Sequence, residues 1–121
     1  TEFKAVQAVK EQVRSVSPGY LEAILPEEIA GEKYALRREN TIGRSKRCSI
    51  QVDLAGVSPV HALLYEKKDG LYLSDFGSRT GSFLNEEKIG KKEELLYTQD
   101  VLQFGEFCCK LHLAGEEEED A

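Results

Sequence analysis

From Tyr20 onward the chain alternates short β-prone runs with turn-forming residues, and this alternation most strongly limits the folds it can adopt. Many short strands joined by Gly-containing connections favour an all-β domain over units of alternating strands and helices. Lys68-Asp69-Gly70, which separates two of the runs, predicts a tight hairpin. The predicted strands are Tyr20–Leu25, Lys33–Leu36, Asn40–Ile42, Ser49–Val52, Ala62–Glu66, Leu71–Ser74, Ser82–Leu84, Val101–Phe104 and Phe107–Leu113.

The two ends of the chain differ from this pattern. Residues 2–16 place apolar side chains at three- and four-residue steps, which predicts a short helix that Ser17-Pro18-Gly19 ends. The run Glu116–Asp120 predicts a disordered acidic tail. We therefore expect an N-terminal helix and linker at 1–19, one domain at 20–114 and an acidic tail at 115–121. A total of 121 residues suits a single domain.

The net charge of −6 is unevenly distributed, because the tail supplies −5 of it. The near-neutral body argues against a nucleic-acid partner. Charges within residues 1–14 indicate no secretory signal, and no apolar run is long enough for a membrane helix. We expect a monomer without a membrane or nucleic-acid partner. Residues 37–47 are an exception, since they hold five cations and one acid.

The three cysteines do not have the spacing of a disulfide framework or a zinc site. Cys108 and Cys109 are adjacent in a predicted strand and should point to opposite faces, so a bond between them is not expected. Core or half-buried thiols in an intracellular reducing compartment (nucleus, cytoplasm or organelle stroma) are the preferred interpretation, and secretion is not expected.

Three segments carry residue types suited to binding an anion. In Thr41–Ser45, a Gly that permits close backbone approach precedes Arg44, whose planar guanidinium fits a phosphate. Val57–Ala62 offers the Ser58 hydroxyl in a loop, and residues 54–64 contain no acid that would repel a dianion. Asp75–Asn85 contains two close glycines and therefore predicts a sharply shaped loop.

These segments together resemble the forkhead-associated (FHA) domain family. The resemblance rests on Gly43-Arg44-Ser45, Ser58-x-x-His61, the Asp75–Asn85 segment (Asp-Phe-Gly-Ser-x-x-Gly-Ser-x-x-Asn) and Asp100–Gly105, which occur in this order. It covers roughly residues 20–114 and implies a twisted two-sheet β-sandwich whose loops, at one end, hold a phosphothreonine-containing segment of a partner protein. It also implies a binding module that needs no metal or cofactor.

The resemblance assigns roles to particular residues of this chain. The residues implied to contact the phosphopeptide are Arg44 and Ser58 at the phosphate, Lys46 or Arg47 as assisting cations, and Arg79 and Thr80 against the peptide. The residues implied to support the loops are Gly43, His61, Gly77, Ser78, Gly81 and Asn85. Two departures from the family pattern predict a weaker or unusually selective site: Thr80 replaces the usual Asn, and Pro59 replaces the usual Arg or Asn. Losing one hydrogen bond in this way costs on the order of 1 kcal/mol.

Other functions remain open at this stage. The departures suggest an FHA-fold scaffolding domain that binds its partner independently of phosphorylation. Ser58, His61 and Asp75 are the residue types of a nucleophilic triad, although Ser58 lacks the Gly-x-Ser-x-Gly context. The acidic tail is a conceivable pseudo-ligand for the basic site.

Overall fold

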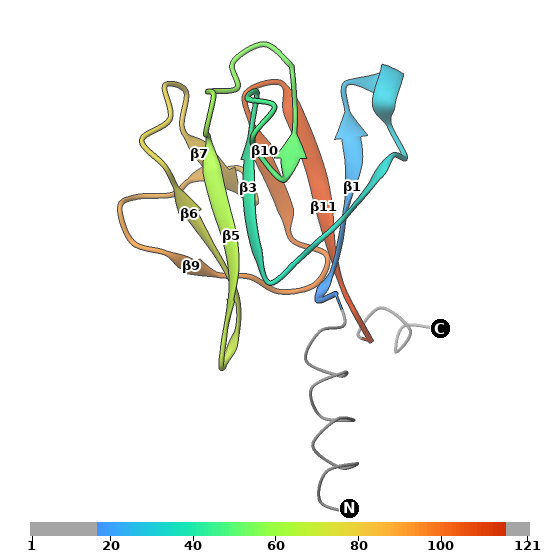
Figure 1. Ribbon diagram of the computed structural model, residues 1–121, viewed down its shortest axis with the longest axis vertical. Coiled ribbons are helices and arrows are strands. Elements are labelled where there is room, and N and C mark those ends of the chain that lie inside the picture. Colours follow the sequence, from blue (N-terminus) through green and yellow to red (C-terminus); the bar gives the residue numbers. More distant parts are fainter. Residues whose placement is uncertain (1–16, 116–121) are drawn as a thin grey trace, which may run out of the picture.

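The computed structural model describes residues 17–115, which form two β-sheets packed face to face (Figure 1). The predicted helix at 2–16 and the acidic run at 116–120 lie outside the described residues. One sheet has the strand order β2-β1-β11-β10-β7-β8, and the other has the order β4-β3-β5-β6-β9. The prediction of an all-β sandwich is confirmed.

All nine predicted strands are present, and two further strands of two residues each were missed. The strands are β1 (Gly19–Leu25), β2 (Lys33–Ala35), β3 (Glu39–Gly43), β4 (Ile50–Gln51), β5 (Ala62–Lys67), β6 (Gly70–Asp75), β7 (Ser82–Leu84), β8 (Glu87–Lys88), β9 (Glu94–Leu95), β10 (Val101–Phe104) and β11 (Phe107–Leu113), with a 3-10 helix at Glu27–Ile29. The missed strands, β8 and β9, consist mainly of charged residues at sheet edges, so they lack the apolar alternation that identifies a half-buried strand.

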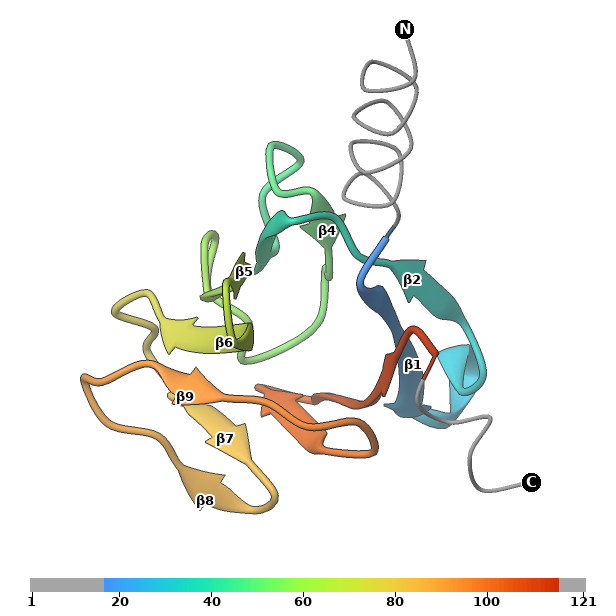
Figure 2. The same ribbon diagram turned by 90° about the horizontal axis from the view of Figure 1, so that it is seen from below.

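Alternating burial along the strands builds the core between the sheets. Within the first five positions of β1 and of β11 every second residue is buried, as expected when successive side chains point to opposite faces. Phe104 and Phe107 are fully buried between the two layers. Figure 2 shows these layers from below. Cys109 is also buried and Cys108 is half-buried, so the expectation that they point to opposite faces is confirmed.

The strand directions bring four loops together at one end of the sandwich. The β3–β4, β4–β5, β6–β7 and β10–β11 connections lie at the upper end in Figure 1. The predicted hairpin between β5 and β6 is confirmed, with Lys67 paired to Gly70, and it lies at the opposite end. The ends of the described chain also leave from that lower end, where the Ala114 N–H donates to the Pro18 carbonyl at 2.8 Å.

Candidate functional site

The β3–β4 loop is fastened directly to the β4–β5 loop by backbone hydrogen bonds. The Arg44 N–H donates to the Ser58 carbonyl at 3.0 Å, and the Ser45 N–H donates to the Pro59 carbonyl at 3.1 Å. Gly43 makes this approach possible, because a Cβ at this position would lie 2.2 Å from the Pro59 carbonyl oxygen. A glycine is therefore needed here for space, and it sets the position from which the Arg44 side chain extends.

His61 connects the loop that carries Ser58 to the β6–β7 loop. Its side chain is completely buried, and its Nδ1 accepts the Ser58 N–H at 3.1 Å. Since a ring nitrogen that accepts this bond carries no proton, Nε2 carries it and donates to the Gly81 carbonyl at 2.8 Å. The ring also packs edge-on against Phe104, with centroids 5.4 Å apart. His61 thus holds two loops at a fixed separation.

Asp75 organises the β6–β7 loop from the end of β6. Its carboxylate accepts hydrogen bonds from the Ser78 hydroxyl (2.5 Å), the Ser78 N–H (3.0 Å) and the Ser82 hydroxyl (2.6 Å). Burial pushes the pKa of Asp75 up, but the hydrogen bonds from Ser78 and Ser82 outweigh it, so this pKa lies below its ordinary value. The Ser78 hydroxyl in turn accepts the Gly81 N–H at 2.9 Å, which closes the loop on itself.

These three loops surround a hollow of about 200 Å³. It is lined by Arg44, Gly56, Val57, Ser58, Arg79 and Thr80, so four of the predicted peptide-contacting residues meet in one place. The Ser58 hydroxyl oxygen accepts the Arg79 N–H at 3.0 Å, which leaves the hydroxyl proton for a ligand. The Thr80 hydroxyl donates to the Gly56 carbonyl at 2.7 Å, so its proton is used within the protein.

The remaining predicted contact residues lie elsewhere. Arg47 lines a separate hollow of about 380 Å³ beside β3 and β5, with Thr41, Leu63 and Tyr65 among its neighbours. Lys46 lines neither hollow. Arg47 and Arg44 therefore line different hollows although both belong to the β3–β4 loop.

The loop-supporting set is also divided. Gly77 lies in the β6–β7 loop with a φ of +63°, a conformation that favours glycine. Asn85 lies beyond the far end of β7, where its Oδ1 accepts the Val101 N–H at 2.9 Å and its Nδ2 donates to Asp100 at 3.1 Å. Asn85 therefore fixes a turn at the opposite end of the sandwich from the hollow.

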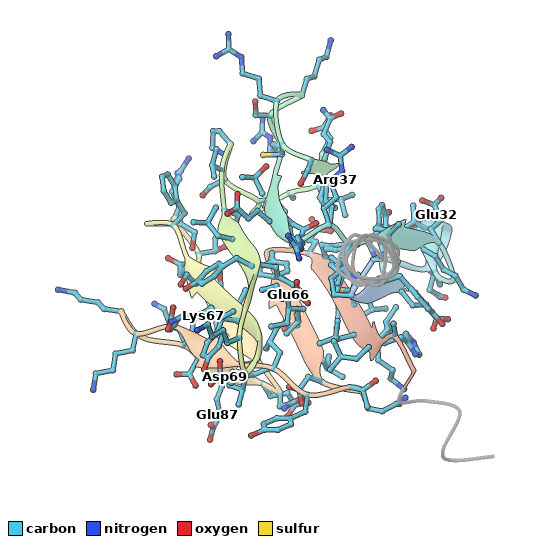
Figure 3. The ribbon with its side chains drawn as sticks, turned by 60° about the horizontal axis from the view of Figure 1, so that its bottom comes forward. Glu32, Arg37, Glu66, Lys67, Asp69 and Glu87 are labelled. Carbon is cyan, nitrogen blue, oxygen red and sulfur yellow. The ribbon has the colours of Figure 1, made fainter. Side chains whose placement is uncertain are left out.

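The structure corrects the interpretation of residues 37–47 as one basic region. Arg37 and Arg38 precede β3, whereas Arg44 follows it, and a strand of five residues spans roughly 17 Å. Arg38 pairs with Glu66 at 3.5 Å. Figure 3, in which the lower end of Figure 1 comes forward, shows Arg37 and Glu66 at that lower end. The cations are close in sequence but divided between the two ends of the sheet.

The expectation that a dianion meets no acid near Ser58 also needs correction. Asp53 lies just outside the acid-free segment 54–64, and its Oδ1 is 3.7 Å from Nε of Arg44. Both side chains are largely exposed. The guanidinium that faces the hollow therefore already has an anionic neighbour.

Ser58, His61 and Asp75 do not form a catalytic relay. Both ring nitrogens of His61 are engaged by backbone groups, and Asp75 is bound by Ser78 and Ser82. A nucleophilic triad instead requires the histidine to bond the serine hydroxyl and the carboxylate.

Within residues 17–115 there is also no cluster of His, Cys, Asp or Glu arranged to hold a metal ion. The same part of the chain contains no helix long and apolar enough to cross a membrane.

Two residues that shape the site were not among those predicted for it. Asp75 could have been found from its spacing, because Asp followed three residues later by Ser is a pattern in which the carboxylate bonds local donors. Asp53 had no such signal, since its position beside Arg44 depends on which strands pair.

Comparisons with known proteins agree with this architecture. The family model described as FHA domain matches residues 40–105, more than half of the chain. The chain is 29% identical over 113 residues to the DNA damage response protein kinase DUN1 of Saccharomyces cerevisiae. The matched region covers 82% of this chain but 22% of the kinase. The chain therefore spans about a fifth of the length of that relative.

Two solved structures have the same fold. One comes from work on phosphothreonine-dependent FHA domain interactions, with a TM-score of 0.68, 24% identity, and coverage of 78% of this chain and 94% of that chain. The other is Mycobacterium tuberculosis EmbR in complex with a low-affinity phosphopeptide, with a TM-score of 0.72, 22% identity, and coverage of 90% and 29%.

Proposed function

The chain belongs to the FHA domain family, and from this premise we propose that it binds a phosphothreonine-containing segment of a partner protein. The observation that carries the proposal is the meeting of Arg44 and Ser58 in one hollow, with Arg79 and Thr80 beside them. The solved FHA domains whose interactions depend on phosphothreonine, or which hold a phosphopeptide, support the same function. The domain acts by binding rather than by catalysis.

The proposed mechanism rests on charge and on prearranged donors. A phosphate group carries about −1.5 to −2 charges and strong acceptor oxygens, and a guanidinium can bind two of these oxygens at once. The Ser58 hydroxyl, held in place by the Arg79 N–H, adds a further donor. His61 and Gly43 keep these donors at fixed positions, so little ordering is required when the ligand binds.

A preference for phosphothreonine over phosphoserine follows from the apolar part of the hollow. Gly56 and Val57 line it beside Thr80 and offer contact to a methyl group. Burying one methyl group contributes about 0.8 kcal/mol, which corresponds to roughly a fourfold difference in affinity. Because the Thr80 proton is donated to Gly56, we expect Thr80 to shape the hollow and to offer a peptide only an acceptor.

Calorimetric titration with matched peptides tests the proposal. Peptides carrying phosphothreonine, phosphoserine or unmodified threonine at one position should bind in that order, with unmodified threonine far weaker. Replacing Arg44 by Ala should cost about 1.5–3 kcal/mol, or about 10- to 150-fold in affinity. The thermal melt should stay unchanged because the side chain is mostly exposed.

Arg38→Ala is the matched control for this titration. It also removes an exposed, ion-paired arginine next to β3, but at the opposite end of that strand. Equal affinity for the phosphorylated and unmodified peptides would contradict the proposal. Partner binding that survives Arg44→Ala without phosphate would instead favour a scaffolding domain.

We further propose that the protein works in a reducing compartment within the cell. Cys48, Cys108 and Cys109 are all free thiols. Burial raises the pKa of the Cys109 thiol well above its ordinary value, which keeps it protonated and unreactive. If the thiols are blocked with an alkylating reagent as the cells are lysed, all three cysteines should be recovered alkylated, and recovery of any of them in a disulfide would contradict this proposal.

A further inference from the structure

Asp53 and Arg44 are brought together by the backbone, so their proximity does not depend on side-chain conformation alone. β3 and β4 are the parallel pair of the second sheet, with Ile42 beside Ile50 and Gly43 beside Gln51. Parallel strands end at the same edge, so the residues that follow them are neighbours. Arg44 follows β3 directly, and Asp53 follows β4 by two positions.

Further hydrogen bonds lock the two strand ends together. The Val52 N–H donates to the Gly43 carbonyl at 2.7 Å, one residue before Arg44 and one residue before Asp53. The Gln51 side-chain amide donates to the Arg44 carbonyl at 3.1 Å. Asp53 is also the sole acid of the sequence between Glu39 and Glu66. A fixed carboxylate therefore accompanies the arginine that faces the hollow.

The charges around the hollow make this carboxylate important for ligand choice. Arg44 and Arg79 line the hollow and Asp53 borders it, so these three side chains together carry +1. A phosphate of about −1.5 to −2 brings the local charge to about −0.5 to −1, with its negative oxygens close to Asp53. One cationic side chain from the peptide would neutralise this excess.

We propose that Asp53 is a specificity-determining residue, which selects phosphothreonine segments that carry a Lys or Arg close to the phosphothreonine. The inference rests on the proposed function, since it concerns the same site. In the free protein the Asp53 carboxylate lies 3.7 Å from Nε of Arg44, and the other N–H groups of the guanidinium stay available to a phosphate. In the complex the Asp53 carboxylate stays close to the phosphate, where a peptide cation can pair with it, and peptides without a cation meet its repulsion.

The test uses phosphothreonine peptides with an otherwise neutral sequence, in which Arg or Ala is placed at each of the four positions on either side. For the unmodified domain, Arg at one or more positions should raise affinity by about two- to fivefold over Ala, the range of exposed ion pairs. In Asp53→Asn that preference should disappear, and the Ala peptides should bind about two- to fivefold more tightly. Both differences should vanish in 1 M salt, where screening acts over about 3 Å.

The Glu39→Gln variant is the matched control. It also removes one exposed acid, but Glu39 lies at the start of β3 and lines the hollow of Arg47. This variant should retain the Arg preference. A preference that persists in Asp53→Asn, that is lost equally in Glu39→Gln, or that is absent from the unmodified domain overturns the inference and leaves the proposed function intact. Failure of every phosphopeptide to bind the unmodified domain overturns both. Since the Asp53 side chain is 79% exposed, Asp53→Asn should melt like the unmodified domain, which the same samples check.

Discussion

Replacing Gly43 by Ala should lower the free energy of unfolding of the domain and should also destroy the hollow. The added Cβ would lie 2.2 Å from the Pro59 carbonyl oxygen and 2.9 Å from the Ser58 carbonyl oxygen. Ordinary contact begins near 3.4 Å, so the two loops have to separate by about 1 Å. The neighbouring atoms are backbone, so no flexible side chain can move aside.

The energetic cost follows from the contacts that this separation breaks. The hydrogen bonds from Arg44 to Ser58 and from Ser45 to Pro59 each contribute about 0.5–1.5 kcal/mol, and forced overpacking typically costs about 1–3 kcal/mol. We expect a loss of about 2–6 kcal/mol in the free energy of unfolding. Because Arg44 and Ser58 move apart, phosphopeptide affinity should fall as well.

Urea unfolding followed by circular dichroism measures this loss, with Gly90→Ala as the control. A Cβ on Gly90 meets nothing within 4 Å, and Gly90 is not in a left-handed conformation, so this identical substitution should change the unfolding free energy by less than about 0.5 kcal/mol. A Gly43→Ala domain that unfolds at the same urea concentration as Gly90→Ala would refute the close-approach argument.

Two further predictions concern the residues that support the loops. His61→Ala should lower the unfolding free energy by about 2–5 kcal/mol, because it leaves the Ser58 N–H and the Gly81 carbonyl without partners and opens a buried space; urea unfolding measures this, and a change below 0.5 kcal/mol would contradict it. Asp75 has a lowered pKa in the folded state, so its stabilising contribution is present above the unfolded pKa of about 3.9 and is lost as pH falls through the folded value. The difference in unfolding free energy between the unmodified domain and Asp75→Asn should therefore shrink between pH 5 and pH 3, and a constant difference would refute this role.

The sequence predicts the strands well because most of them have one face in the core. Leu64 and Leu73 alternate with half-exposed neighbours, and this pattern is visible without a structure. β8 and β9 could not be predicted, because Glu87–Lys88 and Glu94–Leu95 pair at sheet edges where no apolar pattern is required.

The site was predictable in its residue types but not in its electrostatics. Arg44 and Ser58 belong to ordered motifs, and the structure places them in one hollow. Linear charge counting failed twice, because β3 separates Arg38 from Arg44 and because strand pairing brings Asp53 beside Arg44. Spatial charge depends on strand direction and register, and short edge strands such as β4 carry little information about either.

The bond between Ala114 and Pro18 has a practical consequence for how this domain can be handled. The described chain enters and leaves side by side at one pole of the sandwich, and the loops around Arg44 occupy the other (Figure 1). A label, a surface anchor or a fused reporter attached at either end would leave the hollow facing solution. The same geometry makes the domain suitable for splicing into a loop of a host protein, since adjacent ends require little rearrangement of the host.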